Sequence, residues 1–600
     1  MGEAWEIPTR RQAAWFWIRS RWLIARRSAR NLLDSDHRRW RRSPNLVDGA
    51  TIAQVITPLW DDTRPDEFVL LAGKVHNLRT AVWAFNGIVV PAQGVLSFWR
   101  QLGRPLRWRG YVKGREVRGG CVIPTIAGGI CQLSNAIAVC AERAGFGLVE
   151  RHTHSVVGDH AGWGDATVFW NYVDLRIRAP EPWRIEVVMT ERDLIVTIKA
   201  HDDRLNRTNP GDASFDYNRA SAQRPRILAA RGCITCNELN CFRHQPASGH
   251  TQQASAWLLD AATPEFISYL ATKESPTDRI QSLPVRNVIR WLFGRSFTDL
   301  WFREPGRIAE KVHFVVAINV WRSWSLRRAA RSQGKRQAVV VKSAQRLARA
   351  YARRLRPEHT HLVVDQTLLP HLYQSGVLGG RSYDVLAQAL PMREIQRRLD
   401  QAAQGTVVNS DTLTDFRASD DLLEAEFRAM LRARRVITAH QEIADYWCAQ
   451  GLSHVEKLPW IRPETALREL SGNDVPVIVF AASALARKGA YELASALQGL
   501  RCRLLVLGSP SDDTLLWRGI AVEHVGWHPS AWLPRADLVT LPAHVEHSPR
   551  AVLLALTAGI PVIVTPACGV PGGSGVTLVS AGDVPALRCA VQALLDRLKA

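Results

Sequence analysis

The chain contains little cysteine for its length, with ten in 600 residues. Three of them cluster and seven are scattered, which is unlike the dense pairing of a disulfide-stabilised secreted domain. The start, Met1 to Trp5, lacks the basic stretch, apolar core and small-residue cleavage site of a secretory signal. No window of about 18 apolar residues occurs, so no segment is expected to span a bilayer. These absences predict reduced thiols and a cytoplasmic protein.

Lysine is also scarce: it supplies only 10 of the 77 basic residues, and the rest are arginine. The net charge is +21 and the pI about 10.1, values that suit an anionic partner. A GC-rich coding sequence would give the same arginine bias, so the basicity has two explanations. We find no fingerprint of a nucleic-acid-binding fold, and nucleic acid is not an expected partner.

What remains is an ordinary globular composition, with 46% apolar and 22% charged residues and a mean hydropathy of −0.12. A chain of 600 residues is too long for one hydrophobic core. Texture and charge divide it into five parts: a basic Trp-rich segment (1–50), an α+β domain (51–202), a polar Cys-rich connector (203–305), and two Rossmann-like lobes (306–465 and 466–600).

The basic segment interleaves arginine with Trp15, Trp17 and Trp22 at roughly helical spacing over 8–42. Such a helix can lie peripherally on an anionic membrane face, which would be the inner one for a cytoplasmic protein. The alternative is a packing helix whose tryptophans cover the neighbouring domain.

Alternating strands and helices support the two lobes. Expected strands lie at 312–318, 338–341, 361–364, 435–438, 477–480, 504–507, 538–541 and 562–564; expected helices lie at 343–356, 421–434, 489–499, 549–558 and 583–597. In the α+β domain, 184–189 and 194–199 form a predicted β-hairpin, and a helix is expected to end at Gly145.

The first chemical constellation places Cys131 in the opening turn of that helix, where unpaired N–H groups and the helix dipole favour a thiolate. His154 and Asp165 follow, in the order nucleophile, base and orienting acid that thiol hydrolases and acyltransferases use. Alternatively, Cys131 is a buried packing residue.

A wider set of motifs surrounds these residues: Pro91, Ser97-Phe98, Gly103, Gly110-Tyr111, Gly128 to Ser134, Glu150 to Ser155, Asp165 to Val168 and Asn171 to Arg176. Together they resemble the VanW family, which is associated with glycopeptide-antibiotic resistance clusters, and the resemblance covers about 73–200. At Ala127 the family usually has a third glycine. The resemblance implies functional roles for Cys131 and His154.

The second constellation is Cys233, Cys236, Cys241 and His244, a C-x2-C-x4-C-x2-H spacing. Four such ligands suit a tetrahedral Zn²⁺ site, and three thiolates suit part of an iron–sulfur cluster. His250 is a substitute fourth ligand. The competing interpretation is a reduced cysteine cluster in a loop.

The third constellation follows two predicted strands of the last lobe. Arg487, Lys488 and Gly489 precede a helix whose amino end, with the lysine, can hold a diphosphate. Glu546 lies in the loop after 538–541, so its carboxylate is expected at the same sheet edge. Solvated loop charges are the alternative.

These residues, with Leu541-Pro542 and Ala558 to Ile563, resemble the C-terminal lobe of retaining GT-B glycosyltransferases, and 432–445 is similar to the end of their N-terminal lobe. The resemblance spans about 310–600. It implies that Lys488 contacts the donor diphosphate and that Glu546 approaches the transferred sugar, without a metal requirement.

The sequence departs from that family at two places. Leu554 stands where a second glutamate normally holds the nucleotide ribose, and losing those hydrogen bonds costs about 1–3 kcal/mol in a buried site. Asn319 to Arg322 occupy the place of the Gly-rich loop expected after the first strand of the first lobe.

The sequence therefore predicts a multidomain fusion: an α+β VanW-like domain followed by α/β GT-B-like double Rossmann lobes. The expected function is transfer of a sugar from a nucleotide-sugar donor to an envelope-related glycan or peptide-glycan acceptor. Two alternatives stay open, namely a non-enzymatic scaffold with degenerate lobes and a thiol-dependent hydrolase or acyltransferase using Cys131.

Overall fold

The computed structural model of the chain describes residues 10–34, 36, 38–43, 49–60, 68–118, 121–152, 166–200, 254–260, 263–273, 275, 278–282, 312–329, 333–405, 411–414, 416–463, 465, 473–508 and 515–599. The chain forms two compact units. Of the described residues, the first unit holds those up to Ala254 with two short returns at 356–361 and 376–382, and the second unit holds the others.

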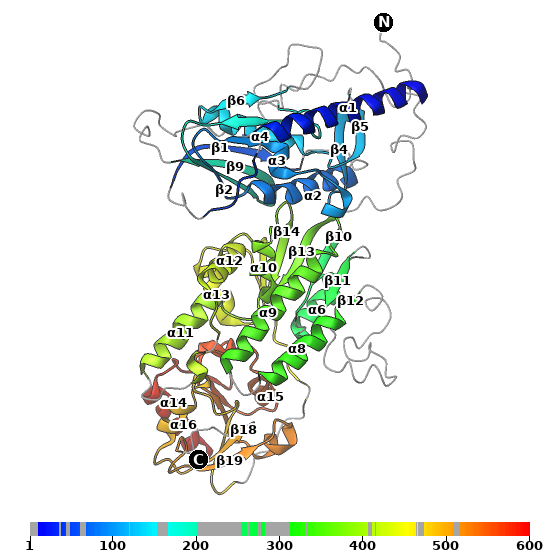
Figure 1. Ribbon diagram of the computed structural model, residues 1–600. Helices are drawn as coiled ribbons and strands as arrows, with labels where there is room; N and C mark the ends of the chain where they lie inside the picture. The colour runs from blue at the N-terminus through cyan, green and yellow to red at the C-terminus, as the bar shows by residue number, and fades with distance from the viewer. Residues whose placement is uncertain are drawn as a thin grey trace. The chain divides into compact units, whose positions relative to one another are not determined.

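The first unit is built on an antiparallel sheet of order β1-β9-β8-β2 (Figure 1). Its strands are β1 (Ala50–Pro58), β2 (Ile88–Val90), β8 (Trp183–Met189) and β9 (Asp193–Ala200). Trp183 to Met189 pairs with Leu194 to Ala200 across a tight turn, which confirms the predicted hairpin. Alternate residues of β8 and β9 are buried, as expected for a sheet with one face on the core.

Helices and two smaller sheets complete the core of the first unit. They are α1 (Arg10–Leu33), α2 (Phe68–Phe85), α3 (Phe98–Leu102), α4 (Cys131–Arg143), the sheet β3-β7-β6 (Val95–Ser97, Arg176–Arg178, Gly147–Glu150) and the hairpin β4-β5 (Lys113–Arg118, Cys121–Ile126). The stripe Leu133, Ile137 and Ala141 of α4 is buried in this core. The helix ends before Gly145, which has φ +72°, so the predicted end is confirmed.

Ala127, which precedes α4, has φ +63°, a left-handed conformation that favours glycine. This is the position at which the resembled family usually has its third glycine. The neighbouring Gly128 allows a close backbone approach, because a Cβ there would lie 2.3 Å from the carbonyl oxygen of Gly114. Backbone packing therefore accounts for a glycine-rich turn at this point.

The second unit begins with a sheet of seven strands in the order β12-β11-β10-β13-β14-β15-β16. The strands are β10 (Ala254–Leu258), β11 (Arg279–Ser282), β12 (Val312–Phe314), β13 (His359–Asp365), β14 (Ser382–Leu386), β15 (Arg435–Thr438) and β16 (Val455–Lys457). By chain order the first six run 3-2-1-4-5-6, the order of a doubly wound dinucleotide-binding sheet. This confirms the first Rossmann-like lobe.

Its boundary differs from the prediction. β10 and β11 come from 203–305, for which the sequence predicts a connector, so the sheet starts at Ala254 and not at 306. The expected strand 338–341 is wrong, because these residues lie within helix α9 (Gln333–Ala352). The expected strand 312–318 ends at Phe314, and Asn319 to Arg322 lie in helix α8 (Val316–Arg328), not in a loop after a first strand.

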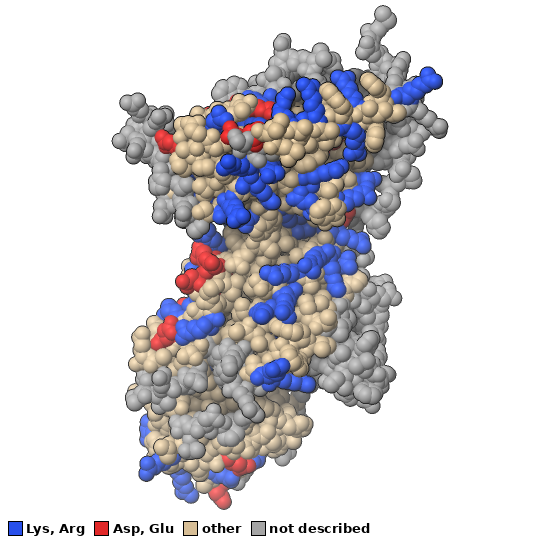
Figure 2. Space-filling model, viewed as in Figure 1, with Lys and Arg blue, Asp and Glu red and all other residues tan. Residues whose placement is uncertain are grey.

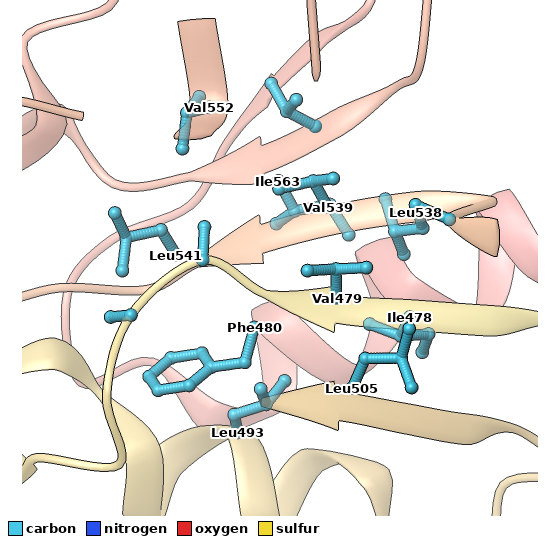
Figure 3. Close-up of a cluster of buried hydrophobic side chains, with 14 of the residues drawn as sticks. Ile478, Val479, Phe480, Leu493, Leu505, Leu538, Val539, Leu541, Val552 and Ile563 are labelled. Atoms are coloured by element: carbon cyan, nitrogen blue, oxygen red, sulfur yellow. The ribbon is translucent and has the colours of Figure 1, made fainter. Parts of the chain in front are cut away.

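The last lobe has six strands in the order β19-β18-β17-β20-β21-β22, again 3-2-1-4-5-6. They are β17 (Val477–Phe480), β18 (Arg503–Leu507), β19 (Ala521–Val525), β20 (Leu538–Leu541), β21 (Val562–Val564) and β22 (Val576–Leu578), and neighbouring strands pair in parallel. The side chains of β17 and β20 are buried throughout. Figure 3 shows Ile478, Val479, Phe480, Leu538 and Val539 in one apolar cluster, so continuous apolar runs here mark strands covered on both faces.

Helices join these strands. In the first lobe they are α6 (Pro264–Lys273), α8, α9, α10 (Leu369–Gln374), α11 (Met392–Gly405), α12 (Asp420–Leu431) and α13 (Gln441–Ala449); in the last lobe they are α14 (Ala490–Leu497), α15 (Arg550–Thr557) and α16 (Val584–Lys599). No described helix has the length and apolarity needed to cross a bilayer.

Candidate functional site

The topology of the last lobe selects one crevice. In a sheet of order 3-2-1-4-5-6, ligands bind beyond the carboxyl ends of strands 1 and 4, where the winding direction reverses. Those strands are the paired neighbours β17 and β20. The loop after β17 carries Lys488, and the loop after β20 carries Glu546. Both predicted residues therefore lie at the ligand-binding edge of the sheet.

Lys488 and Glu546 form a direct ion pair. The Lys488 Nζ lies 2.8 Å from the Glu546 Oε2 and 2.9 Å from the carbonyl oxygen of Val545. The other carboxylate oxygen accepts hydrogen bonds from the backbone N–H groups of His547 (2.8 Å) and Ser548 (2.9 Å). Only 12% and 13% of the two side chains are exposed, so solvated loop charges are the wrong interpretation.

Two of the three N–H donors of the Lys488 ammonium are engaged in this way. The third has no hydrogen-bond partner within the described part of the chain. Removal from water lowers the pKa of Lys488, and Arg487 lowers it further, while Glu546 opposes both. Burial would raise the pKa of Glu546, but the adjacent ammonium outweighs it and holds that pKa well below its usual value. Glu546 is thus anionic at neutral pH.

Gly489 fixes how the two loops meet. Its φ is +79°, and a Cβ at this residue would lie 2.1 Å from the carbonyl oxygen of Pro542. The carbonyl oxygen of Arg487 accepts from the backbone N–H of His544 at 3.1 Å. The sequence predicts Gly489 as a donor-binding residue; the structure gives it the role of letting the β17 loop contact the β20 loop.

Two histidines border the pair. His440, which follows β15, points its Nε2 at the carbonyl oxygens of Glu546 and Ala567, each 3.1 Å away. Its ring lies against Gly569, where a Cβ would come within 2.2 Å. Burial lowers the pKa of His440 to about 4 and that of His547 to about 3, so both rings are neutral at pH 7. Sequence reasoning assigned them no role, although His440 follows a strand of the first lobe as Lys488 and Glu546 follow strands of the last.

Phe416 also belongs to this neighbourhood. Its ring centre lies 5.6 Å from that of His547, and the Arg487 guanidinium lies 5.6 Å above the same phenyl ring. Phe416 has φ +61°, an uncommon conformation for a bulky residue. Backbone strain at Phe416 thus coincides with the point where a first-lobe loop contacts the last lobe.

Leu554, which replaces the expected second glutamate, lies in α15 and packs in the hydrophobic core of the last lobe. It offers apolar surface and no hydrogen-bonding group. Leu554 therefore cannot supply the hydrogen bonds that a glutamate at this position would make.

The equivalent crevice of the first lobe is built from different chemistry. Asp260 follows β10 and Asp365 ends β13, which are strands 1 and 4 of that sheet. The Thr367 hydroxyl lies 2.9 Å from a carboxylate oxygen of each. Arg322 pairs with Asp260, and the Gln388 amide donates to Asp365 at 2.9 Å. These groups satisfy one another.

A clamp joins the two lobes. Both guanidinium nitrogens of Arg550, at the start of α15, bond to the two carboxylate oxygens of Glu265 in α6, at 2.8 and 2.6 Å. The same carboxylate accepts from the backbone N–H of Ile461, in the segment between the lobes, at 3.0 Å. Bidentate geometry with a buried carboxylate makes this a strong contact.

A separate cavity of about 820 Å³ opens between α11, α14 and residues 580–582. Among its lining residues is His544, whose Nε2 lies 2.6 Å from Glu492. Neither Lys488 nor Glu546 lines this cavity.

In the first unit, Cys131 is the first residue of α4, which confirms its predicted place. Its Sγ lies 3.8 Å from both the Thr167 hydroxyl and the carbonyl oxygen of Val168. His154 and Asp165 lie outside the described residues, so the Cys-His-Asp arrangement stays a prediction.

The structure instead gathers other residues of the VanW-like motifs. Asp174 accepts from the Ser97 hydroxyl at 2.6 Å and lies 3.3 Å from Arg176. Arg176 lies 3.4 Å from Glu150, which also bonds to Arg27 of α1. Burial alone would raise the pKa of Glu150, but Arg27 outweighs it and holds that pKa below its usual value. This polar network ties α1 to the domain.

The predicted metal ligands Cys233, Cys236, Cys241 and His244, with His250, all lie outside the described residues. Within the described ranges, no group of three or more His, Cys, Asp or Glu side chains is arranged to hold a metal ion.

Two family models each match about a fifth of the chain. Residues 73–199 match the model of VanW like protein, and residues 475–597 match the model of glycosyl transferases group 1. The chain therefore has a VanW-like domain in its N-terminal region and a group 1 glycosyltransferase domain in its C-terminal region.

Among curated proteins, the chain is similar to the uncharacterized protein YoaR of Bacillus subtilis, at 28% identity over 130 residues (21% of this chain and 43% of that protein). It is also similar to the vancomycin B-type resistance protein VanW of Enterococcus faecalis, at 26% identity over 163 residues (26% and 59%). The chain thus spans about half the length of these relatives.

Among solved structures, a sucrose-phosphate synthase of Thermosynechococcus elongatus aligns at a TM-score of 0.40 and 14% identity, over 58% of this chain and 91% of that one. The lipopolysaccharide outer core galactosyltransferase WaaB aligns at 0.34 and 12%, over 57% and 90%. Because these TM-scores are low, the description of the last lobe depends on its strand order and on the family match instead.

Proposed function

We propose that the second unit transfers a sugar from a nucleotide-sugar donor, with Lys488 at the donor diphosphate and Glu546 at the transferred sugar. The observation that carries this proposal is the Lys488–Glu546 pair beyond strands 1 and 4 of a sheet whose sequence matches a glycosyltransferase model.

The chemistry follows from the charges of the pair. Breaking the bond between sugar and diphosphate leaves negative charge on the diphosphate oxygens. The uncommitted N–H of Lys488 can donate to such an oxygen and stabilise this charge in a site largely removed from water. Glu546 remains anionic, so it can interact with a sugar that becomes electron-poor as its bond to diphosphate breaks. Retention of anomeric configuration is part of the proposal by resemblance to the retaining GT-B enzymes.

The proposed acceptor is inferred from the presence of a VanW-like domain in the same chain. A VanW-like domain precedes the lobes, so we assign acceptor recognition to the first unit and an envelope-related glycan or peptide-glycan to the acceptor. The protein would then act at the cytoplasmic side of the envelope.

The test is a screen of UDP- and GDP-sugars with mass detection on the purified full chain. Glu546→Gln and Lys488→Met should each lower turnover by about 100-fold, since each removes a charge that acts on the reacting bond. Lys457→Met, at an exposed lysine of the same unit, is the matched control and should leave turnover unchanged. Proton spectra of the product anomer report retention.

A non-enzymatic scaffold is the second candidate function. Leu554 packs in the core, and Lys488 and Glu546 already neutralise each other's charge. Calorimetric titration separates the two functions. Absence of heat at millimolar donor, with the chain still folded, would remove the transferase and leave the scaffold.

A further inference from the structure

The outer face of α1 carries exposed aromatic residues. Trp15, Ile18 and Trp22 are 65%, 51% and 58% exposed, and Leu33 at the end of the helix is 90% exposed. At 3.6 residues per turn these four side chains fall within about 60° around the helix axis. They therefore form one apolar stripe, here called the α1 stripe.

The face of α1 opposite to the stripe contacts the rest of the first unit, and this leaves the stripe pointing outward. Arg27 bonds to Glu150, and Ser28 accepts from the Asn171 amide at 3.2 Å. Asn31 accepts from Arg176 at 2.7 Å. Thus polar side chains of α1 face the domain, and Trp15 and Trp22 face away from it. Trp17 lies on another side of the helix, but all three tryptophans are more than half exposed, so the interpretation of these tryptophans as a cover for the neighbouring domain is wrong.

Positive charge flanks the stripe. Arg19, Arg26 and Arg30 are exposed and follow one side of it, and Arg21 lies on the other side. The helix contains seven arginines and no acidic residue. Arg26 lies over the Trp22 ring at 5.3 Å, so a cationic and an aromatic group adjoin on the stripe itself. Arg21 lies over Trp17 at 5.2 Å on another side of the helix. Figure 2 shows Lys and Arg side chains gathered over the part of the first unit that α1 crosses.

We propose that the α1 stripe docks the protein on an anionic lipid bilayer, with the tryptophans at the headgroup boundary and the flanking arginines on lipid phosphates. Aromatic rings with an apolar body and one N–H donor suit that boundary, and guanidinium groups pair with phosphate oxygens. A protein partner would need an acidic rim complementary to these arginines. A bilayer rich in anionic headgroups supplies that charge over the whole length of the helix.

The experiment is co-sedimentation of the full chain with phosphatidylcholine vesicles, with and without phosphatidylglycerol. We expect binding that requires the anionic lipid and weakens as ionic strength rises from about 0.1 M to 1 M, where the screening length falls from about 10 to 3 Å. Arg19→Gln, Arg26→Gln and Arg30→Gln together should weaken binding about 100-fold, at about fivefold for each arginine.

The Trp15→Ser, Trp22→Ser double variant should weaken binding at least tenfold, because it removes the apolar contact. Matched controls are Trp108→Ser and Trp527→Ser, which remove tryptophans of 81% and 56% exposure outside α1 and should leave binding unchanged. All replaced side chains are exposed, so an unchanged melting temperature is expected and verifies folding.

Equal binding by the Trp15, Trp22 double variant, or no sedimentation of the unmodified chain with anionic vesicles, would overturn the proposal. A dimer in light scattering that the double variant dissolves, without vesicle binding, would also overturn it and assign the stripe to a second copy of the chain.

Discussion

The two Rossmann-like lobes share a strand order and differ at the crevice that this order creates. Beyond strands 1 and 4, the first lobe has Asp260 and Asp365 bridged by Thr367, whereas the last lobe has Lys488 and Glu546. Topology fixes where a ligand can bind, and the loop residues fix which ligand. In the first crevice, the polar groups hydrogen-bond to one another. In the last crevice, one N–H of the Lys488 ammonium has no hydrogen-bond partner among the described residues.

The largest expected effect comes from separating the buried pair. Lys488→Met leaves the Glu546 carboxylate buried without its counter-ion, and such losses cost about 3–5 kcal/mol. In a lobe of this size that is a fall of roughly 10 °C in the melting temperature of its transition. Scanning calorimetry of the full chain measures it.

The double variant Lys488→Met, Glu546→Gln sharpens the result. With both charges gone, no buried ion lacks a partner, and most of the lost stability should return. A double variant as unstable as the single one would show that the lysine acts through packing, which would weaken the contrast between the lobes.

The pH dependence of the last lobe is expected to be the next largest effect. The pKa of His440 in the folded chain is about 4, below its ordinary 6.5, because burial disfavours the charged ring. The unfolded chain therefore binds more protons between these values. The stability contributed by His440 is complete above pH 6.5 and is lost as the pH falls toward 4, by up to about 1.4 kcal/mol per pH unit.

His440→Gln tests this expectation, since an amide can donate to the same carbonyls without titrating. Its melting temperature should fall less steeply than that of the unmodified chain between pH 6.5 and 4. His547 titrates in both proteins, so the difference in slope reports on His440. Identical slopes would contradict a neutral His440 at the contact between the lobes.

The smallest effect is expected in the first lobe. Thr367→Val keeps the side-chain shape but removes the one hydroxyl proton that Asp260 and Asp365 share as acceptors, which should cost about 1–2 kcal/mol of stability because Thr367 is itself exposed. Donor binding measured by calorimetry should not change. A loss of donor affinity equal to that of Lys488→Met would mean that both crevices hold the donor.

The sequence predicts the last lobe well because its strands are short apolar runs bounded by turns, as at 477–480 and 538–541. It fails at 338–341, where three consecutive valines, Val339 to Val341, are partly buried within α9. It also misses β10, since five residues in a polar stretch give no signal until their neighbours in the sheet are known.

The candidate site shows the same limit. Lys488 and Glu546 are predictable because each follows a strand, and the structure adds that they touch. His440 follows β15 by the same logic, but its contact with the carbonyl oxygens of Glu546 and Ala567 depends on how the lobes pack, which spacing does not encode. Phe416 depends on the same packing.

The contact between residue 489 and the carbonyl of Pro542 has a consequence for mutational studies. Any side chain at 489 would force the two backbones apart and so pull the ammonium from the carboxylate without altering either group. A screen for loss of the proposed transfer activity should therefore recover replacements of Gly489, although this residue has no side chain that could take part in the reaction. Substitutions in the two loops should therefore be correlated among related sequences, because neither backbone can shift unless the other follows.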